Sequence, residues 1–216
     1  MKFQKLALAL STIPLLSGCV FKANGFVEFA DDVNDDVEVG YHPIGIPYIF
    51  GGHGSSTPIT KDLSITAAHV AVYNYSNVIA YHKYCDVAII ESDNSDVEIP
   101  KRGLVYPDSK ITHYGIGLSG MLVKGEGTYK RDVRFDDGIK ECAVSLSDGA
   151  MQSGMSGGGA YNDKGEFVGV NVAIASDVTL DGKPVDYDRT SMFVSTAHME
   201  QWIEDVIEAY DMGYLD

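Results

Sequence analysis

The apolar residues of this chain come in short runs of β-strand length. Between residues 44 and 195, glycine, proline, asparagine and aspartate residues separate these runs, a pattern typical of a β-sandwich or a pair of β-barrels. The 216 residues, of which 45% are hydrophobic, are enough for one body of two packed sheets or barrels. The sequence therefore predicts an all-β protein. The predicted strands lie in Ile46–Phe50, Leu63–Ala68, Val78–Tyr81, Val87–Ile90, Ile111–Ile116, Met121–Val123, Cys142–Leu146, Glu166–Ala175 and Met192–Ser195.

Only the segment 196–210 has the periodicity of an amphipathic helix. Its apolar residues recur at the spacing of one helix face, and either Ser195 or Thr196 can cap its start. The opposite face is acidic, which argues against a helix that lies on an anionic membrane. We therefore expect a C-terminal helix that packs on the β body. The residues of its apolar face are Met199, Trp202, Ile203, Val206, Ile207 and Tyr210.

Residues 1–18 have the organisation of a secretory signal. Two lysines precede an apolar stretch at 6–16 that is too short to span a bilayer. The stretch from Leu16 to Cys19 (LSGC) resembles the lipobox of bacterial lipoproteins, whose cysteine becomes the lipidated N-terminus. This resemblance implies a membrane anchor made of acyl chains on Cys19. The alternative is an ordinary secretory signal, in which Cys19 has no role. Because Val20 rather than aspartate follows the cysteine, the resemblance to Gram-negative lipoproteins implies the cell envelope, at the outer membrane.

Composition divides the rest of the chain into segments. Residues 19–43 are rich in acidic side chains, so we expect a solvated linker between the lipid anchor and the folded body. Residues 101–110 contain proline and mixed charges, and they predict a crossing between an N-terminal half at 44–100 and a C-terminal half at 111–195. The formal net charge of −15 argues against nucleic acid as a partner.

The run from Gly154 to Gly158 (GMSGG) surrounds a candidate nucleophile. Ser156 can attack a carbonyl only where the backbone leaves room for a substrate, and Gly154 has no Cβ to block that approach. The N–H groups of Gly154 and Ser156 would form an oxyanion hole, in which each donor is worth roughly 3–4 kcal/mol. Glycine-rich turns around a serine are also common in ordinary loops, so the interpretation depends on partners elsewhere in the chain.

A serine nucleophile needs a base and a group that orients the base. The candidate base is His69, which follows an apolar run that ends in two alanines. The candidate acid is Asp86, a carboxylate that opens the apolar run 87–90 and needs a partner in low-dielectric surroundings. A bond from His69 to Asp86 would leave the second ring nitrogen free to accept the serine proton. Asp93 and Asp96 are the alternative acids, but both lie in a polar, turn-like segment.

Three sequence blocks, in the order His, Asp, Ser, carry a resemblance to a known family. They are TAAH at 66–69, DVAII at 86–90 and GMSGG at 154–158, and they resemble the signature blocks of the trypsin-like (chymotrypsin-fold) serine peptidases. The resemblance covers roughly residues 44–210. It implies two six-stranded antiparallel β-barrels of chymotrypsin type, with the three side chains in the cleft between them. It also implies hydrolysis of polypeptides through an acyl-enzyme, without a metal or a cofactor.

Two departures from the family pattern matter. Asp86 follows His69 by only 17 residues, which requires a tight hairpin between them. Met155 stands where trypsin has the aspartate that pairs with a new N-terminus after zymogen cleavage. The resemblance therefore implies a site that is preformed, as in the HtrA-type and glutamyl-endopeptidase-type bacterial members. The chain has no room for a PDZ-like module, so we expect a monomer rather than an HtrA-style regulated oligomer.

The resemblance also implies a specificity pocket at Ala150, Met151 and Asn171. Ala150 lies where trypsin has the aspartate that selects arginine or lysine, so trypsin-like cleavage is disfavoured. Asn171 lies where glutamyl endopeptidases carry a histidine that reads a Glu or Gln side chain. The amide of Asn171 could hydrogen-bond a polar substrate side chain, or Asn171 could be an ordinary strand residue. A pocket for a small or apolar side chain is the favoured alternative.

The leading interpretation is a membrane-anchored serine endopeptidase that acts outside the cytoplasm. A catalytically silent binding or scaffold protein could keep the same fold, because a fold does not guarantee activity. A lipase or esterase is disfavoured, because the histidine of that class comes last in the chain. Cys85 and Cys142 could pair as a disulfide or remain separate buried residues, and the sequence leaves that choice open.

Overall fold

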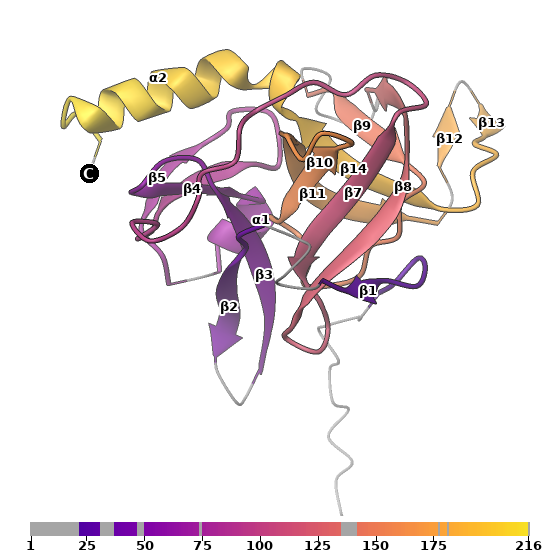
Figure 1. Cartoon of the computed structure of the whole chain (residues 1–216), viewed down its shortest axis with the longest axis horizontal. Coiled ribbons are helices and arrows are strands. Elements are labelled where there is room, and N and C mark those ends of the chain that lie inside the picture. Colours follow the sequence, from indigo (N-terminus) through magenta and orange to yellow (C-terminus); the bar gives the residue numbers. More distant parts are fainter. Residues whose placement is uncertain are drawn as a thin grey trace, which may run out of the picture.

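The computed structural model of the chain describes residues 22–30, 37–46, 50–73, 75–134, 142–176, 178–180 and 182–215. These residues form two antiparallel β bodies, with helix α2 running along the top of the molecule in the view of Figure 1. No helix within these ranges combines the length and the hydropathy that a membrane span requires. The expected signal segment 1–18 and the expected lipidation site Cys19 lie outside the described residues.

The N-terminal half is a five-stranded antiparallel sheet with the strand order β2-β3-β4-β6-β5. Its middle strand, β4, is buried along its whole length, so Leu63 and Ile65 pack in the core. Among the described residues, β2 and β5 at the two edges do not pair with each other. The described residues of this half therefore form a sheet, and the second closed barrel that we expected is not clearly shown. The strands are β2 (Gly40–Ile46), β3 (Phe50–Pro58), β4 (Leu63–Thr66), β5 (Val78–Tyr81) and β6 (Ala88–Glu91).

The C-terminal half is a closed six-stranded barrel. Its strands follow the order β8-β7-β10-β11-β14-β9, and a pairing between β8 and β9 closes the ring. The barrel expected for this half is thus confirmed. A small hairpin of β12 (Thr179–Leu180) and β13 (Lys183–Pro184) extends from it. The barrel strands are β7 (Lys110–Ile116), β8 (Leu122–Val133), β9 (Val144–Ser147), β10 (Gly159–Asn162), β11 (Phe167–Ala175) and β14 (Thr190–Ser195).

The two halves share one apolar core. Its largest cluster takes Ile65 and Val87 from the N-terminal sheet, Tyr161 and Phe167 from the barrel, and Ile203 from α2. Burial of each such side chain contributes roughly 1.5–3 kcal/mol. Apolar packing therefore stabilises the contact between the two halves, just as it stabilises each half.

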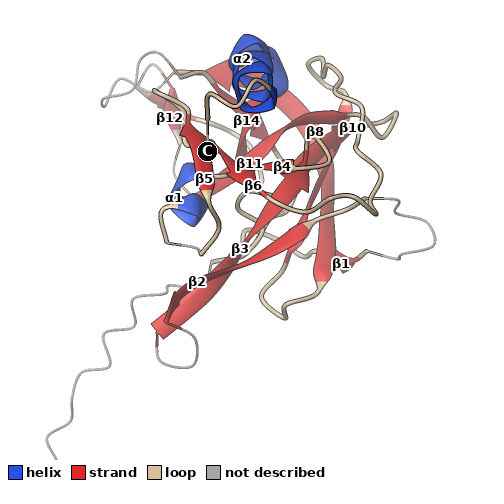
Figure 2. Cartoon of the chain, turned by 90° about the vertical axis from the view of Figure 1, so that its left-hand side faces the viewer, coloured by secondary structure: helices blue, strands red, loops and turns tan. Residues whose placement is uncertain are grey.

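The C-terminal helix predicted from the apolar periodicity is confirmed. A 3₁₀ turn, η1 (Thr196–His198), leads into α2 (Glu200–Asp211), and the Ser195 hydroxyl accepts the N–H of Ala197 at 3.3 Å. Ile203 and Val206 are buried, as the helix face predicted. In both views α2 lies above β5, so the helix covers the edge of the N-terminal sheet (Figures 1 and 2).

The expected linker at 19–43 is in part folded structure, which corrects that prediction. Strand β1 (Glu28–Phe29) pairs with β8 of the barrel, and β2 begins at Gly40. The physical reason is that backbone N–H and C=O groups of an exposed strand edge can bond any extended segment, whatever its side chains. The acidic stretch at 31–36, on which the prediction rested, lies outside the described residues.

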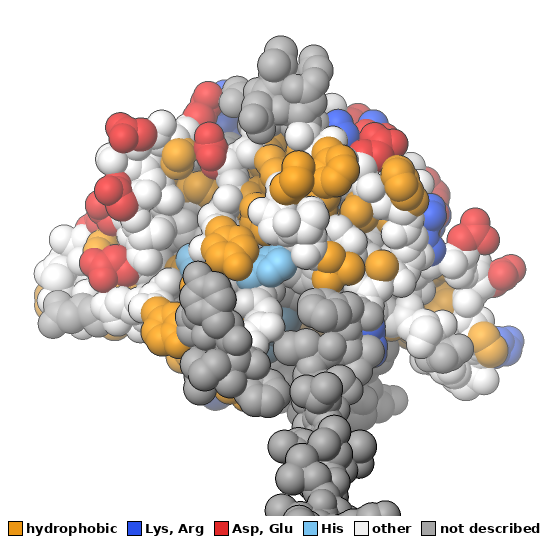
Figure 3. All heavy atoms as spheres, turned by 90° about the horizontal axis from the view of Figure 1, so that it is seen from below, with side chains coloured by type: hydrophobic (Ala, Val, Ile, Leu, Met, Phe, Trp, Pro, Cys, Tyr) orange, Lys and Arg blue, Asp and Glu red, His pale blue; other side chains and the backbone are white. Residues whose placement is uncertain are grey.

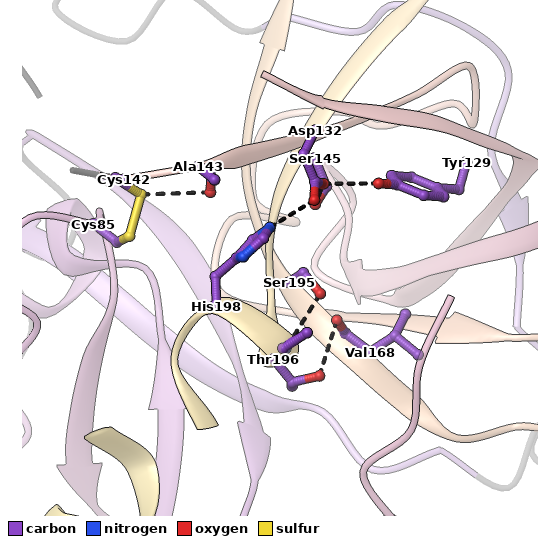
Figure 4. A network of polar contacts seen from close by, with 11 residues as sticks. Cys85, Tyr129, Asp132, Cys142, Ala143, Ser145, Val168, Ser195, Thr196 and His198 are labelled. Atoms are coloured by element: carbon purple, nitrogen blue, oxygen red, sulfur yellow. Dashed lines mark hydrogen bonds and ion pairs between the residues drawn. A yellow bond between two sulfur atoms is a disulfide. The ribbon is translucent and has the colours of Figure 1, made fainter. Parts of the chain in front are cut away.

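A disulfide joins the two halves, which settles the choice that the sequence left open. Cys85 lies just before β6 and Cys142 just before β9, with their Cα atoms 5.1 Å apart. Figure 4 shows the disulfide near a network in which Asp132 of β8 accepts hydrogen bonds from three side chains. Burial raises the pKa of Asp132, but these bonds outweigh burial and hold it below its usual value. The donors are Tyr129, Ser145 and His198, at 2.6–2.8 Å.

Candidate active site

His69 and Asp86 lie against each other at the end of the N-terminal sheet. His69 sits in the one-turn helix α1 (Ala68–Ala71), which directly follows the buried strand β4. Asp86 lies in the segment that leads into β6, and β6 pairs with β4, so the two residues meet. Asp86 Oδ2 lies 2.6 Å from His69 Nδ1, and its Oδ1 accepts the backbone N–H of His69 at 2.9 Å. The carboxylate is thus fixed by both oxygens.

This contact determines the tautomer of His69. An ionised carboxylate only accepts hydrogen bonds, so Nδ1 carries the proton and Nε2 presents its lone pair. The side chains of His69 and Asp86 are 46% and 42% exposed, so a substrate can reach the ring. Seen from below, histidine side chains reach the surface among hydrophobic ones (Figure 3). The alternative acid Asp93 instead bonds Ser95 within its own turn, and these bonds lower the pKa of Asp93.

The loop that carries Ser156 docks on the strands that lead to His69. The carbonyl of Ser156 accepts the N–H of Ser55 on β3 at 2.7 Å, and the Ser55 hydroxyl donates to the carbonyl of Gly154 at 2.8 Å. Gly157 has φ +89°, and a Cβ there would collide with the Ser55 carbonyl and with the Thr66 hydroxyl. Only glycine fits both the left-handed backbone and this close approach. Thr66 is the last residue of β4, three positions before His69.

The structure does not complete the link between Ser156 and His69. Within the described part of the chain the Ser156 hydroxyl has no hydrogen-bond partner. The residue is partly exposed. Catalytic hydrogen bonds are often long in the absence of substrate and tighten in the complex. The histidine and the aspartate are therefore assembled, and the serine lies on the neighbouring loop without a direct bond to them.

The backbone of the serine loop leaves two N–H groups unpaired. From Met151 to Gly158, every N–H has an acceptor among the described residues except those of Gly154 and Ser156. Gly154 is buried and has φ +97°. Buried backbone N–H groups are nearly always paired, so the N–H of Gly154 is an exception to this rule among the described contacts. The acceptors for the other groups are Asn24 Oδ1, Met155 Sδ and the carbonyls of Lys22, Gln152, Asn171 and Met155.

The three side chains that we expect to form the specificity pocket are buried. Asn171 is fully buried in β11, and Ala150 and Met151 are 3% and 2% exposed. The Asn171 amide donates to the carbonyls of Tyr114 and Gly159, so it has no group left to read a substrate. Its backbone instead holds the serine loop, since the Asn171 carbonyl accepts the N–H of Gly157 at 2.8 Å.

A serine–histidine contact that the sequence motifs did not indicate lies inside the barrel. His113 Nδ1 is 2.6 Å from Asn171 Oδ1, and its Nε2 is 2.6 Å from the Ser147 hydroxyl. The amide oxygen only accepts, so Nδ1 donates to it and the Ser147 hydroxyl donates to Nε2. Burial lowers the pKa of His113 to about 4, despite the opposing effect of the Asn171 bond. All three residues are fully buried, so no substrate carbonyl can reach Ser147.

Among the described residues, no three His, Cys, Asp or Glu side chains cluster as metal ligands. A cavity of about 940 Å³ lies beside the barrel, and Asn24, Ile174 and Arg189 are among the residues that line it. None of His69, Asp86 and Ser156 lines this cavity.

The fold defines the class of structures to which this chain is similar. No family model matches the chain, and no curated protein matches its sequence. Solved structures titled as proteases, HtrA-type ones among them, do match its fold, at 13–16% sequence identity. At this level of identity the similarity shows the fold alone.

Three of these structures illustrate the match. The HtrA-type protease AlgW with a tripeptide superposes with a TM-score of 0.66 at 15% identity, over 82% of this chain and 62% of that one. The active form of the Rv3671c protease from M. tuberculosis gives 0.64 at 14% identity, over 81% and 82%. The MamO protease domain from Magnetospirillum magneticum gives 0.59 at 16%, over 77% and 96%. This chain thus spans less than two thirds of the AlgW chain.

Proposed function

We propose that this protein is a serine endopeptidase that cleaves polypeptides through an acyl-enzyme on Ser156. The observation that carries the proposal is the pair of unpaired N–H groups at Gly154 and Ser156, on either side of the buried Met155. A loop that satisfies all of its other N–H groups and leaves these two free is built to bind a developing oxyanion. The His69–Asp86 pair supplies the base that such a nucleophile needs.

The reaction follows from the protonation states of these groups. Nε2 of His69 takes the proton of the Ser156 hydroxyl as its oxygen attacks the substrate carbonyl. The carbonyl oxygen becomes an oxyanion, which the N–H groups of Gly154 and Ser156 bind. His69 then gives its proton to the leaving amine, and water hydrolyses the ester by the same steps. Asp86 stays ionised throughout and stabilises the imidazolium across the 2.6 Å contact.

The substrate class rests on a structural neighbour. Structures of AlgW are titled as complexes with a tripeptide and with a decapeptide, so that neighbour binds peptides. Acyl transfer by a serine also suits the carbonyl of a peptide bond. A polypeptide is therefore the substrate that we propose.

Lipidation at Cys19 would bring this chemistry to a membrane surface. Lys22, three residues after Cys19, bonds Ser153 of the loop that precedes the nucleophile. Three Cα–Cα steps limit the distance between Cys19 and Lys22 to about 11 Å. An enzyme anchored in this way would favour polypeptide segments that lie close to the lipid. We propose the cell envelope, at the outer membrane, as its place.

A catalytically silent scaffold is the rival candidate, and one observation favours it. The Ser156 hydroxyl makes no bond to His69 among the described contacts. Fold similarity does not separate the two candidates, because structures of Rv3671c titled as active and as inactive forms both match this chain. An experiment on the serine itself is required.

A fluorophosphonate probe tests the proposal, because it reacts only with an activated serine. We expect the purified full-length chain to be labelled at Ser156, and the Ser156→Ala variant to remain unlabelled. Ser147→Ala is the matched control, since it removes a serine whose hydroxyl lies 2.6 Å from the ring of His113. This variant should keep the label on Ser156, as peptide mass spectrometry would show. A folded parent protein without label would overturn the peptidase proposal in favour of the scaffold.

A further inference from the structure

The segment 22–29, here called the N-terminal segment, pairs with the loop that precedes the nucleophile. The N–H of Lys22 donates to the Ser153 hydroxyl, and the carbonyl of Lys22 accepts the N–H of Ser153, both at 2.8 Å. Ala23 and Gln152 form an antiparallel bridge next to these bonds. The N-terminal segment thus pairs with this loop in the manner of a short antiparallel strand.

Asn24 continues this pairing with both its backbone and its side chain. Its N–H donates to the Met151 carbonyl at 3.1 Å, and its Oδ1 accepts the Met151 N–H at 2.8 Å. Its amide nitrogen donates to the Thr190 carbonyl at 3.1 Å and to the Ser191 hydroxyl at 2.9 Å. One side chain therefore ties the loop to the start of β14, and the barrel fixes that strand.

Apolar packing joins the same segment to the residue before the nucleophile. Val27 packs against a cluster made of Val123, Met151 and Met155. Met155 is fully buried, and it lies between the two residues whose N–H groups are unpaired. Where trypsin has an ion pair at this position, this chain has an apolar contact and a set of backbone bonds.

We propose that the N-terminal segment holds the loop in the conformation that turns the N–H groups of Gly154 and Ser156 toward the substrate. Asn24 is the positioning residue of this arrangement. Two N–H groups of the loop, those of Met151 and Ser153, find their acceptors only on the N-terminal segment among the described residues. Without these acceptors the loop would turn toward other partners, and the free N–H groups would move. The kinetic part of this inference rests on the proposed peptidase function.

The arrangement predicts a specific kinetic signature. The oxyanion forms in the transition state and not in the bound substrate, so a misplaced loop lowers kcat more than it changes KM. A shift of about 1 Å at such a site can cost about 100-fold in rate. We expect Asn24→Ala to lower kcat between about 10- and 100-fold, with KM changed less than about threefold.

Asn94→Ala is the matched control for this variant. Asn94 also donates its amide to backbone carbonyls and to a serine hydroxyl, but it does so in the N-terminal sheet. Both variants lose the same kinds of hydrogen bond, so their melting temperatures should fall by similar amounts. Only Asn24→Ala should lose kcat and show slower fluorophosphonate labelling. If both variants lose kcat equally, or if Asn24→Ala keeps the parent kcat, the positioning role is overturned.

Hydrogen exchange provides a readout that does not depend on activity. In the Ser156→Ala background, Asn24→Ala should raise the exchange of peptides that cover residues 149–157, while Asn94→Ala should leave them unchanged. This measurement decides the inference even if the parent protein is not labelled and the peptidase proposal fails. Unchanged exchange in the Asn24→Ala protein would overturn the inference by itself.

Discussion

Two histidines of this protein are held at Nδ1 by a side-chain oxygen 2.6 Å away, yet their surroundings differ completely. His69 faces the Asp86 carboxylate, and its side chain is 46% exposed. His113 faces the Asn171 amide inside the barrel, and burial lowers its pKa to about 4. His113 also contacts a serine directly, whereas His69 makes no such contact among the described residues.

The comparison shows that the hydrogen bonds of a histidine do not by themselves identify a catalytic site. In the barrel, Ser147, His113 and Asn171 form a buried chain of hydrogen bonds, here called the buried set. The His113 ring stays neutral at physiological pH, and no substrate reaches it. The exposed set has a charged partner that can stabilise an imidazolium, and it has unpaired N–H groups on the neighbouring loop. Access and charge therefore distinguish the two sets.

The largest effect is expected from removal of the charge on Asp86. Asp86→Asn keeps the size of the side chain but favours the wrong tautomer of His69, so kcat should fall roughly 10⁴-fold, as in known triads. Steady-state kinetics on a peptide library substrate would measure this loss. An Asp86→Asn variant with near-parent kcat would contradict the assignment of the acid.

The converse substitution sharpens the same comparison. Asn171→Asp in the Ser156→Ala background places a carboxylate next to His113 and completes a serine–histidine–aspartate set. We expect no fluorophosphonate label on Ser147, because the set stays buried. A labelled Ser147 would show that charge alone, and not access, separates the two histidines.

An intermediate effect is expected from the disulfide next to Asp86. Its loop of 57 residues predicts a loss of about 4 kcal/mol in unfolding free energy when the bridge is removed. The variant Cys85→Ala/Cys142→Ala should therefore unfold at lower urea concentration. Its hydrogen exchange should rise around His69 more than around His113, because Cys85 adjoins Asp86. Equal increases at both histidines would show that the bridge stabilises the whole fold without favouring the exposed set.

The smallest effect is the pH dependence that His113 imposes on stability. Burial lowers the pKa of His113 from 6.5 to about 4. Between these two pH values the His113 side chain is therefore protonated in the unfolded chain and neutral in the folded chain. This contribution to stability is complete above pH 6.5 and falls as the pH drops toward 4. The loss is roughly 3 kcal/mol. Urea unfolding at pH 7.5 and pH 4 should show a smaller loss for His113→Gln than for the parent protein, and an equal loss would contradict this origin.

The local patterns of the sequence predicted part of this structure well. The apolar periodicity of 196–210 predicted a helix, and α2 with η1 occupies that segment. The strand at 111–116 is also where the pattern placed it. Strand β10 (Gly159–Asn162) was missed, because its glycine and asparagine are typical of turns and only the partners β7 and β11 make it a strand.

The candidate site shows the same division between local and distant information. Short motifs indicated His69, Asp86 and Ser156 as candidate residues, and the structure places His69 and Asp86 in contact. The specificity residues were drawn from a resemblance at single positions. Burial of Asn171 depends on β7, β10 and β14, and no single position reports on such neighbours.

By itself the sequence determined the all-β class, the C-terminal helix and the residues that can carry acyl-transfer chemistry, because periodicity and side-chain type are local properties. Only the tertiary structure decided the pairing of Cys85 with Cys142, the burial of His113 and the docking of Asn24 on the nucleophile loop. Each of these depends on contacts between segments far apart in the chain. Such contacts depend on which backbone groups and apolar surfaces the fold brings together, and local sequence patterns carry no information about that.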